Sequence, residues 1–180
     1  MTTKKMFALA TRLALIVAVV VVMLSLVNYL TRDTIAERKR VAGENARAAL
    51  MADCEFKQMT NLEIPEDSGV TAVYRAEKNG TVMGYCLDVS VKGYNEISMI
   101  VGVNADLSVA GVKILSQSET PGIGSKAVDE NGAYLPLFRT LSLENVKSSY
   151  VSGATISSKG IWNGVSAAVD FCAELTGKGD

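Results

Sequence analysis

An uncharged run near the N-terminus constrains this chain more than any other feature of its sequence. No residue between Arg12 and Arg32 is charged, and the stretch from Leu13 to Leu30 reads LALIVAVVVVMLSLVNYL. As a helix, these 18 residues would extend about 27 Å, close to the roughly 30 Å thickness of the hydrocarbon core of a bilayer. We therefore expect a single transmembrane helix that anchors the rest of the chain.

Three other kinds of N-terminal segment also contain an apolar run. A cleaved signal peptide has a shorter run and a small-residue cleavage site, whereas this run continues into TRDTIAERKR. A lipoprotein needs a cysteine directly after the run, and the first cysteine here is Cys54. A type IV pilin needs a glycine cleavage site and an acidic residue where the run begins, and the sequence has neither. A retained anchor is the prediction.

The charges are distributed unevenly along the chain. Residues 1–40 carry a net charge of +5 and residues 41–180 a net charge of −6, which together give the −1 of the whole chain. A basic start before an acidic body is typical of a membrane-anchored protein. The basic N-terminal tail favours a cytoplasmic N-terminus, so we expect the body outside, although basic residues after the run weaken this bias. The small net charge argues against nucleic acid as a partner.

The residue types exclude several kinds of chemistry. The 180-residue chain has no histidine, and its three cysteines form no CxxC pair. It therefore lacks a histidine-based hydrolytic triad, the imidazole ligands of catalytic zinc, and a Cys₄ metal site. We expect no catalytic residue and no metal site in this chain. Cys86 and Cys172 are expected to be small buried hydrophobic residues.

After the anchor, the sequence predicts one α+β domain. Residues 33–53 are rich in Ala, Arg and Glu and predict a helix, either a stalk or a helix packed on the domain. An alternating stretch and three further stretches separated by turn residues predict four antiparallel strands, at residues 70–76, 82–91, 96–103 and 108–115. Residues 145–151 are a further candidate strand, and residues 156–175 have the period of an amphipathic helix. The predicted fold class is a single N-terminal transmembrane helix followed by an antiparallel sheet with flanking helices.

We expect three parts in the chain. Residues 1–32 form a short cytoplasmic tail and the transmembrane anchor, and residues 33–60 form a helical stalk. Residues 61–180 form the extracytoplasmic domain.

A segment of small residues, SGATISS at residues 152–158, directly precedes the last predicted helix. Its hydroxyls can cap the first N–H groups of that helix, which is the ordinary role of such residues. The same N–H groups and the helix dipole also suit an anion such as a phosphate. The spacing alone favours a plain N-cap, with a phosphate site as the alternative.

A second segment, ETPGIG at residues 119–124, contains a Pro-Gly pair that favours a type II turn. A glycine-rich loop with an acid and a hydroxyl can wrap a planar ligand, and an ordinary surface turn has the same composition. The segment is neither a GxGxxG fingerprint nor a P-loop.

Together the two segments resemble the FMN-binding domains of flavin-carrying respiratory subunits. The resemblance covers nearly the whole chain, from the N-terminal membrane helix through Gly93-Tyr94 and ETPGIG to SGAT. It is strongest to the G subunits of Rnf complexes, the ion-translocating ferredoxin:NAD⁺ oxidoreductases; the C subunits of sodium-translocating NADH:quinone oxidoreductases are relatives. Ile123 departs from the favoured ETPGLG, and Ser118 stands where many relatives have a histidine.

The resemblance implies a covalent cofactor and a function. FMN is expected as a phosphothreonyl ester of Thr155, attached outside the cytoplasm by a flavin transferase that uses FAD and a divalent metal. The other residues expected to bind it are Ser152, Gly153, Ala154, Glu119, Thr120, Pro121, Gly122 and Ile123. The chain is then a flavoprotein electron-transfer subunit in the cell membrane rather than a stand-alone enzyme. With other membrane subunits, it would couple ferredoxin:NAD⁺ redox chemistry to ion transport, as a translocase of Na⁺ or H⁺.

Two alternatives fit the same sequence. The chain is a C-type flavin subunit of a sodium-translocating quinone reductase, or a free-standing extracytoplasmic flavin shuttle. Alternatively, it is a non-redox membrane-anchored binding domain, which would carry no flavin and tolerate Thr155→Ala.

Overall fold

The computed structural model describes residues 3–60 and 62–177, and the chain divides into two compact units between Val41 and Ala42. The first unit is most of helix α1, which runs from Thr3 to Leu50. The part Ala10–Leu50 is the one described helix long and apolar enough to cross a membrane. Its side chains from residue 10 to residue 42 are exposed, and an apolar helix of this length suits a lipid environment.

The second unit contains a sheet of five consecutive antiparallel strands. The strands are β1 (Glu55–Gln58), β2 (Val70–Lys78), β3 (Thr81–Lys92), β4 (Glu96–Asn104) and β5 (Val109–Gln117). Strands β2 to β5 correspond to the four predicted strands, so the predicted α+β fold class is confirmed. The sequence missed β1, which lies within the range 33–60 assigned to a stalk; the three predicted boundaries stay a prediction.

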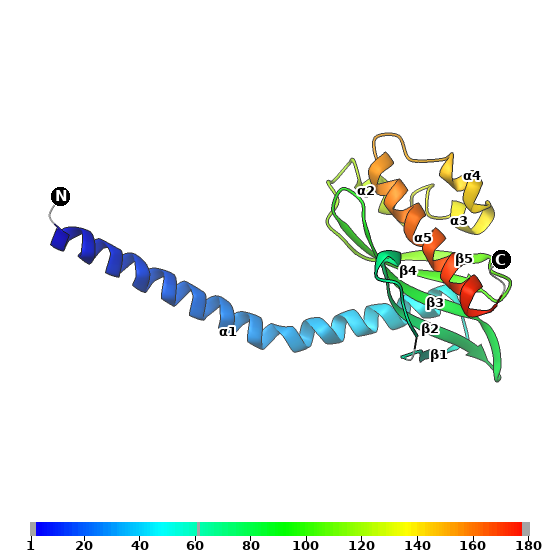
Figure 1. The fold of residues 1–180 in the computed structure, drawn as a ribbon, viewed down its shortest axis with the longest axis horizontal. Coiled ribbons are helices and arrows are strands. Elements are labelled where there is room, and N and C mark those ends of the chain that lie inside the picture. The colour runs from blue at the N-terminus through cyan, green and yellow to red at the C-terminus, as the bar shows by residue number, and fades with distance from the viewer. Residues whose placement is uncertain (1–2, 61, 178–180) are drawn as a thin grey trace. The chain divides into compact units, whose positions relative to one another are not determined.

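Helix α5, from Thr155 to Leu175, crosses one face of the sheet (Figure 1). Its apolar side chains, including Ile161 and Val165, pack with Leu87 and Val101 of the sheet in the larger of two hydrophobic clusters. The last turns of α1 contribute to the smaller cluster, around Cys86. Successive side chains along β3 point to opposite faces of the sheet, so Cys86 lies on the face opposite to its neighbour Leu87. The sheet is therefore covered on both sides.

Three short helices lie between β5 and α5, and one of them occupies a segment that was predicted to be a strand. The helices are α2 (Ser125–Val128), α3 (Leu137–Thr140) and α4 (Leu143–Lys147), and a 3₁₀ turn, η1 (Glu66–Ser68), precedes β2. Residues 145–151 were expected as a strand, but their first half belongs to α4. Ser142 has the extended backbone of an N-cap position, and Glu144 lies in the first turn, where the helix dipole favours an acid.

The three cysteines differ in accessibility, which predicts a labelling pattern. Cys86 and Cys172 are fully buried, as expected, and burial raises the pKa of each thiol to about 12. Only the thiolate reacts readily with iodoacetamide. At pH 8 the native full-length chain in detergent should therefore be alkylated at Cys54, which is half-buried, and mass spectrometry should find three labels after denaturation. Labelling of Cys86 or Cys172 in the folded protein would contradict this expectation.

Candidate functional site

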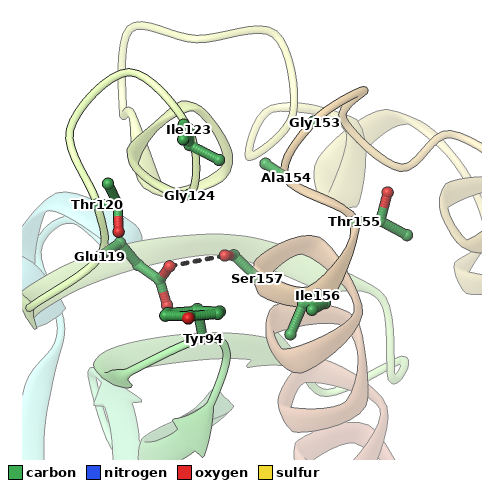
Figure 2. Close-up of a pocket in the computed structure, with 10 residues that line it drawn as sticks. All are labelled: Tyr94, Glu119, Thr120, Ile123, Gly124, Gly153, Ala154, Thr155, Ile156 and Ser157. Carbon is green, nitrogen blue, oxygen red and sulfur yellow. Dashed lines mark hydrogen bonds between the residues drawn. The ribbon is translucent and has the colours of Figure 1, made fainter.

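A pocket of about 500 Å³ lies where the turn between β3 and β4, the loop 119–124 and the N-terminus of α5 meet (Figure 2). Its volume is typical of a small-molecule site. The lining residues are Tyr94, Glu119, Thr120, Ile123, Gly124, Gly153, Ala154, Thr155, Ile156 and Ser157. The two segments singled out in the sequence thus contribute to one pocket.

A buried carboxylate connects the three segments that form the pocket. Glu119 is 5% exposed, and its Oε1 accepts a hydrogen bond from the backbone N–H of Asn95 at 3.0 Å. Its Oε2 accepts a hydrogen bond from the Ser157 hydroxyl at 2.8 Å, drawn as a dashed line in Figure 2. We call these three residues the Glu119 clamp. The clamp holds the β3–β4 turn and α5 against the loop.

Two glycines make room for this carboxylate. A Cβ at Gly93 would lie 2.6 Å from Glu119 Oε1 and 3.1 Å from the Cα of Ser157. A Cβ at Gly124 would collide with Glu119 Oε2 and lie 2.8 Å from the Ser157 hydroxyl. Real Cβ atoms essentially never come within 3.0 Å of another heavy atom, as both would do here. The clamp therefore depends on glycine at both positions.

The N-terminus of α5 is not capped by a side chain. Ala154 occupies the N-cap position and provides no side-chain hydrogen bond. The serines that follow are used elsewhere: Ser157 donates to Glu119, and the Ser158 hydroxyl donates to the Ala154 carbonyl at 2.9 Å. The expected side-chain cap is thus not formed. The N–H groups at the start of a helix and the helix dipole suit an anion, so the phosphate interpretation of this segment gains support.

Thr155 is the first residue of α5 and is exposed at the edge of the pocket. In Figure 2 its side chain points away from Glu119 and Ser157. Gly153, two residues earlier, has a φ of +79°, a left-handed conformation that favours glycine and turns the chain into the helix. The Thr155 hydroxyl is therefore accessible to another molecule from outside.

The pocket does not include every residue that the sequence pointed to. Ser152, Pro121 and Gly122 belong to the two segments but are not among its lining residues. The lining residues that the resemblance did not assign to the flavin are Tyr94, Gly124, Ile156 and Ser157. Three of them could have been found from the sequence because they adjoin the two segments. Gly124 ends the ETPGIG segment, and Ile156 and Ser157 directly follow SGAT. Tyr94 is the second residue of the Gly93-Tyr94 pair.

The lining fits a ligand that combines a flat apolar ring with a phosphate. Large apolar side chains surround the opening, and the N-terminus of α5 suits the phosphate. The acidic side chain, Glu119, already has a protein donor on each oxygen. Among the described residues, no group of three or more acids and cysteines could hold a metal ion.

Comparison with known proteins shows that the pocket lies within a segment similar to a flavin-binding family. Residues 93–170, which include all of the pocket, match the family of FMN-binding domains. Over 96% of its length the chain is 29% identical to the G subunit of the Na⁺-translocating ferredoxin:NAD⁺ oxidoreductase complex of Acetobacterium woodii, of which the match covers 94%. It is 26% identical to the G subunit of the proton-translocating ferredoxin:NAD⁺ oxidoreductase complex of Clostridium ljungdahlii, over 95% of this chain and 94% of the relative. The G subunit of an ion-translocating oxidoreductase complex from Methanosarcina acetivorans is 27% identical over 80% of this chain and 84% of the relative.

Proposed function

We propose that this chain is a membrane-anchored electron-transfer subunit. Its match to FMN-binding domains, and its similarity over most of its length to the G subunits of ion-translocating oxidoreductase complexes, support the proposal. Within this chain, FMN is attached covalently through its phosphate to Thr155. The complex it joins couples ferredoxin:NAD⁺ redox chemistry to ion translocation. The named ion is Na⁺ in one relative and the proton in another, so the proposal extends to either ion.

The observation that carries the proposal is the position of Thr155. Its hydroxyl is exposed at the uncapped N-terminus of α5 and at the edge of a pocket with apolar walls. A phosphate on this oxygen would lie beside the first N–H groups of the helix, where an anion is favoured. The ring attached to that phosphate would have the pocket within reach.

Attachment requires a second protein and a nucleotide. The Thr155 oxygen bonds to the phosphorus on the flavin side of FAD, the pyrophosphate bond breaks, and AMP leaves. The hydroxyl proton passes to a base of the flavin transferase. The buried acid of the pocket, Glu119, does not serve as this base, because it already accepts a hydrogen bond from the Ser157 hydroxyl and the Thr155 side chain points away from Glu119 (Figure 2). Such a transferase needs access to Thr155, and the exposure of this residue supports that requirement.

FMN, when bound, supplies transfer of one or two electrons, and the protein supplies position and surroundings. A phosphate ester leaves the ring itself unmodified, so contacts in the pocket can still adjust its reduction potential. It also prevents loss of the cofactor on the side of the membrane without an FMN pool. We propose that the domain lies on this extracytoplasmic side, with residues 1–32 as tail and anchor, 33–60 as a stalk and 61–180 as the flavin domain. The basic residues of the N-terminal tail, Lys4, Lys5 and Arg12, support this orientation, although the basic residues after the apolar run weaken the bias.

One denaturing gel tests the proposed attachment. The full chain is expressed with its export route and a flavin transferase, and the gel is viewed under ultraviolet light before staining. We expect a fluorescent band for the wild type, no fluorescence for Thr155→Ala, and retained fluorescence for Thr155→Ser, which keeps a hydroxyl at the same place. Intact-mass measurement should find one FMN on the fluorescent species.

The gel also needs a positive control, a second flavin acceptor known to be modified by the same transferase. A colourless wild-type band beside a fluorescent control would contradict the proposal. A fluorescent Thr155→Ala band would show that the flavin is attached elsewhere.

A further inference from the structure

The domain leaves its most exposed large apolar side chains in one place. In the described part of Ala42–Asp180, three of them are more than half exposed: Tyr94 at 67%, Ile156 at 60% and Ile123 at 56%. All three line the pocket beside Thr155. They come from the β3–β4 turn, from α5 and from the loop 119–124. Such a concentration of exposed apolar surface marks a place where another group binds.

The three side chains surround a slot. In Figure 2, Ile123 lies on one side of the Glu119–Ser157 hydrogen bond, and Tyr94 and Ile156 lie on the other. Glu119 and Ser157 thus lie between the two apolar sides in this view, and the apolar side chains are free to contact a flat group placed between them. The Tyr94 ring is the one aromatic ring among the lining residues.

We propose that Tyr94 is the stacking platform for the isoalloxazine ring of the FMN on Thr155, with Ile123 against the opposite face and Ile156 at the edge. This inference rests on the proposed function, since it takes FMN on Thr155 as the occupant. An exposed tyrosine binds an aromatic ring more favourably than an aliphatic group, because offset stacking adds to the free energy gained by burial of apolar area. Thr155 immediately precedes Ile156 and also lines the pocket, so the attachment point of the FMN phosphate lies beside the slot.

Contact with a phenol has an optical consequence. An excited flavin takes an electron from a tyrosine or tryptophan ring that touches it, and the electron returns without emission of light. A phenylalanine ring is too hard to oxidise to do this. The flavin of the folded wild type should therefore be dim, and the brightness should depend on the side chain at position 94.

The test compares fully flavinylated full-length proteins in detergent. Fluorescence is measured per flavin, with loading quantified by intact mass and by visible absorbance after denaturation. We expect Tyr94→Phe and Tyr94→Leu to be several-fold brighter than the wild type and Tyr94→Trp to stay dim. The matched control is Tyr85→Phe, which removes a hydroxyl from a half-buried tyrosine of β3 outside the pocket lining and should leave the fluorescence unchanged.

A second measurement reports on the orientation of the ring without relying on quenching. The visible circular dichroism of a flavin arises from a fixed asymmetric environment, and Tyr94→Leu should lose much of it. Equal loading with fluorescence and circular dichroism unchanged in Tyr94→Leu would overturn the stacking and leave the attachment at Thr155 intact. A wild type without covalent flavin would overturn the proposed function, and the stacking with it.

Discussion

Gly124→Ala is expected to lower the free energy of unfolding by about 2–4 kcal/mol and to impair flavin loading. Gly124 has a φ of −61° and a ψ of −32°, which any residue adopts, so the substitution adds no backbone strain. The added methyl group would instead collide with Glu119 Oε2 and lie 2.8 Å from the Ser157 hydroxyl. The Glu119 clamp must open to admit it.

Opening the clamp is costly because two of its members, Glu119 and Ser157, are buried. Glu119 is 5% exposed and Ser157 is 2% exposed, so neither finds water easily after the two separate. A buried donor or acceptor that loses its partner costs about 1–3 kcal/mol, and more when the group is charged. The loop 119–124 would also lose its connection to α5, and the walls of the pocket would no longer be held together.

A double-mutant cycle separates this collision from a general effect of a larger side chain. Unfolding of the full chain in detergent by denaturant can be followed through Trp162, the single tryptophan, which is partly buried in α5. In a Glu119→Ala background the nearest obstacle to the methyl group is gone, and the Ser157 hydroxyl, released from Glu119, can rotate away, so Gly124→Ala should cost much less there than in the wild type. Equal costs in both backgrounds would show that Glu119 is not what excludes the methyl group.

Four of the five strands could be predicted because the residues that mark them are close together in the sequence. Strands β2 to β5 are rich in apolar and β-branched residues and end at turn residues, such as Asn79 with its φ of 51°. Strand β1 has the sequence EFKQ, which contains one apolar residue, and pairs at the edge of the sheet with β2 alone. Four polar-rich residues carry no period that distinguishes a strand from a loop. Strand β1 forms because β2 offers it a partner, which the sequence does not show.

The candidate site could be predicted in its segments but not in its contacts. Small residues before an amphipathic helix, together with a Pro-Gly loop, pointed to the two segments that meet at the pocket. The bond between Glu119 and Ser157 joins residues 38 positions apart. Glu119 was predicted to bind the flavin, and the structure adds that both its oxygens accept hydrogen bonds from the protein. Long-range pairing of this kind follows from the fold and not from spacing.

Arg47→Met is expected to lower the free energy of unfolding by about 3 kcal/mol, because it leaves a partly buried carboxylate without its partner. Arg47, in the last turn of α1, donates from Nη2 to both oxygens of Asp88 on β3, at 2.7 and 2.8 Å. Its guanidinium also lies over the Tyr74 ring, 3.5 Å from the centroid. The side chains of Arg47 and Asp88 are 7% and 23% exposed. Methionine keeps the apolar volume and removes the charge.

The loss should depend on pH in a direction that the environment of Asp88 determines. Burial raises the pKa of the Asp88 carboxyl above its ordinary 3.8, and the Arg47 guanidinium lowers it in part. Without Arg47 the raising effect acts alone, so the folded state of the variant binds a proton at higher pH than the unfolded state. The deficit relative to the wild type should be full at neutral pH. It should shrink as the pH falls through the raised pKa of Asp88 towards 3.8, because protonation removes the unpaired charge.

Asp88→Asn added to Arg47→Met provides the control for this pH dependence. The amide cannot ionise, so the double variant should be more stable than Arg47→Met at neutral pH and show no comparable recovery in acid. The free energy of unfolding of both variants is measured with denaturant from about pH 4.5 to about pH 7.5 and compared at each pH. A deficit in Arg47→Met that stays constant over this range would assign the loss to the contact with Tyr74 and to packing. A deficit that closes in acid would identify the Arg47–Asp88 charge pair as a contact that holds the end of α1 against strand β3.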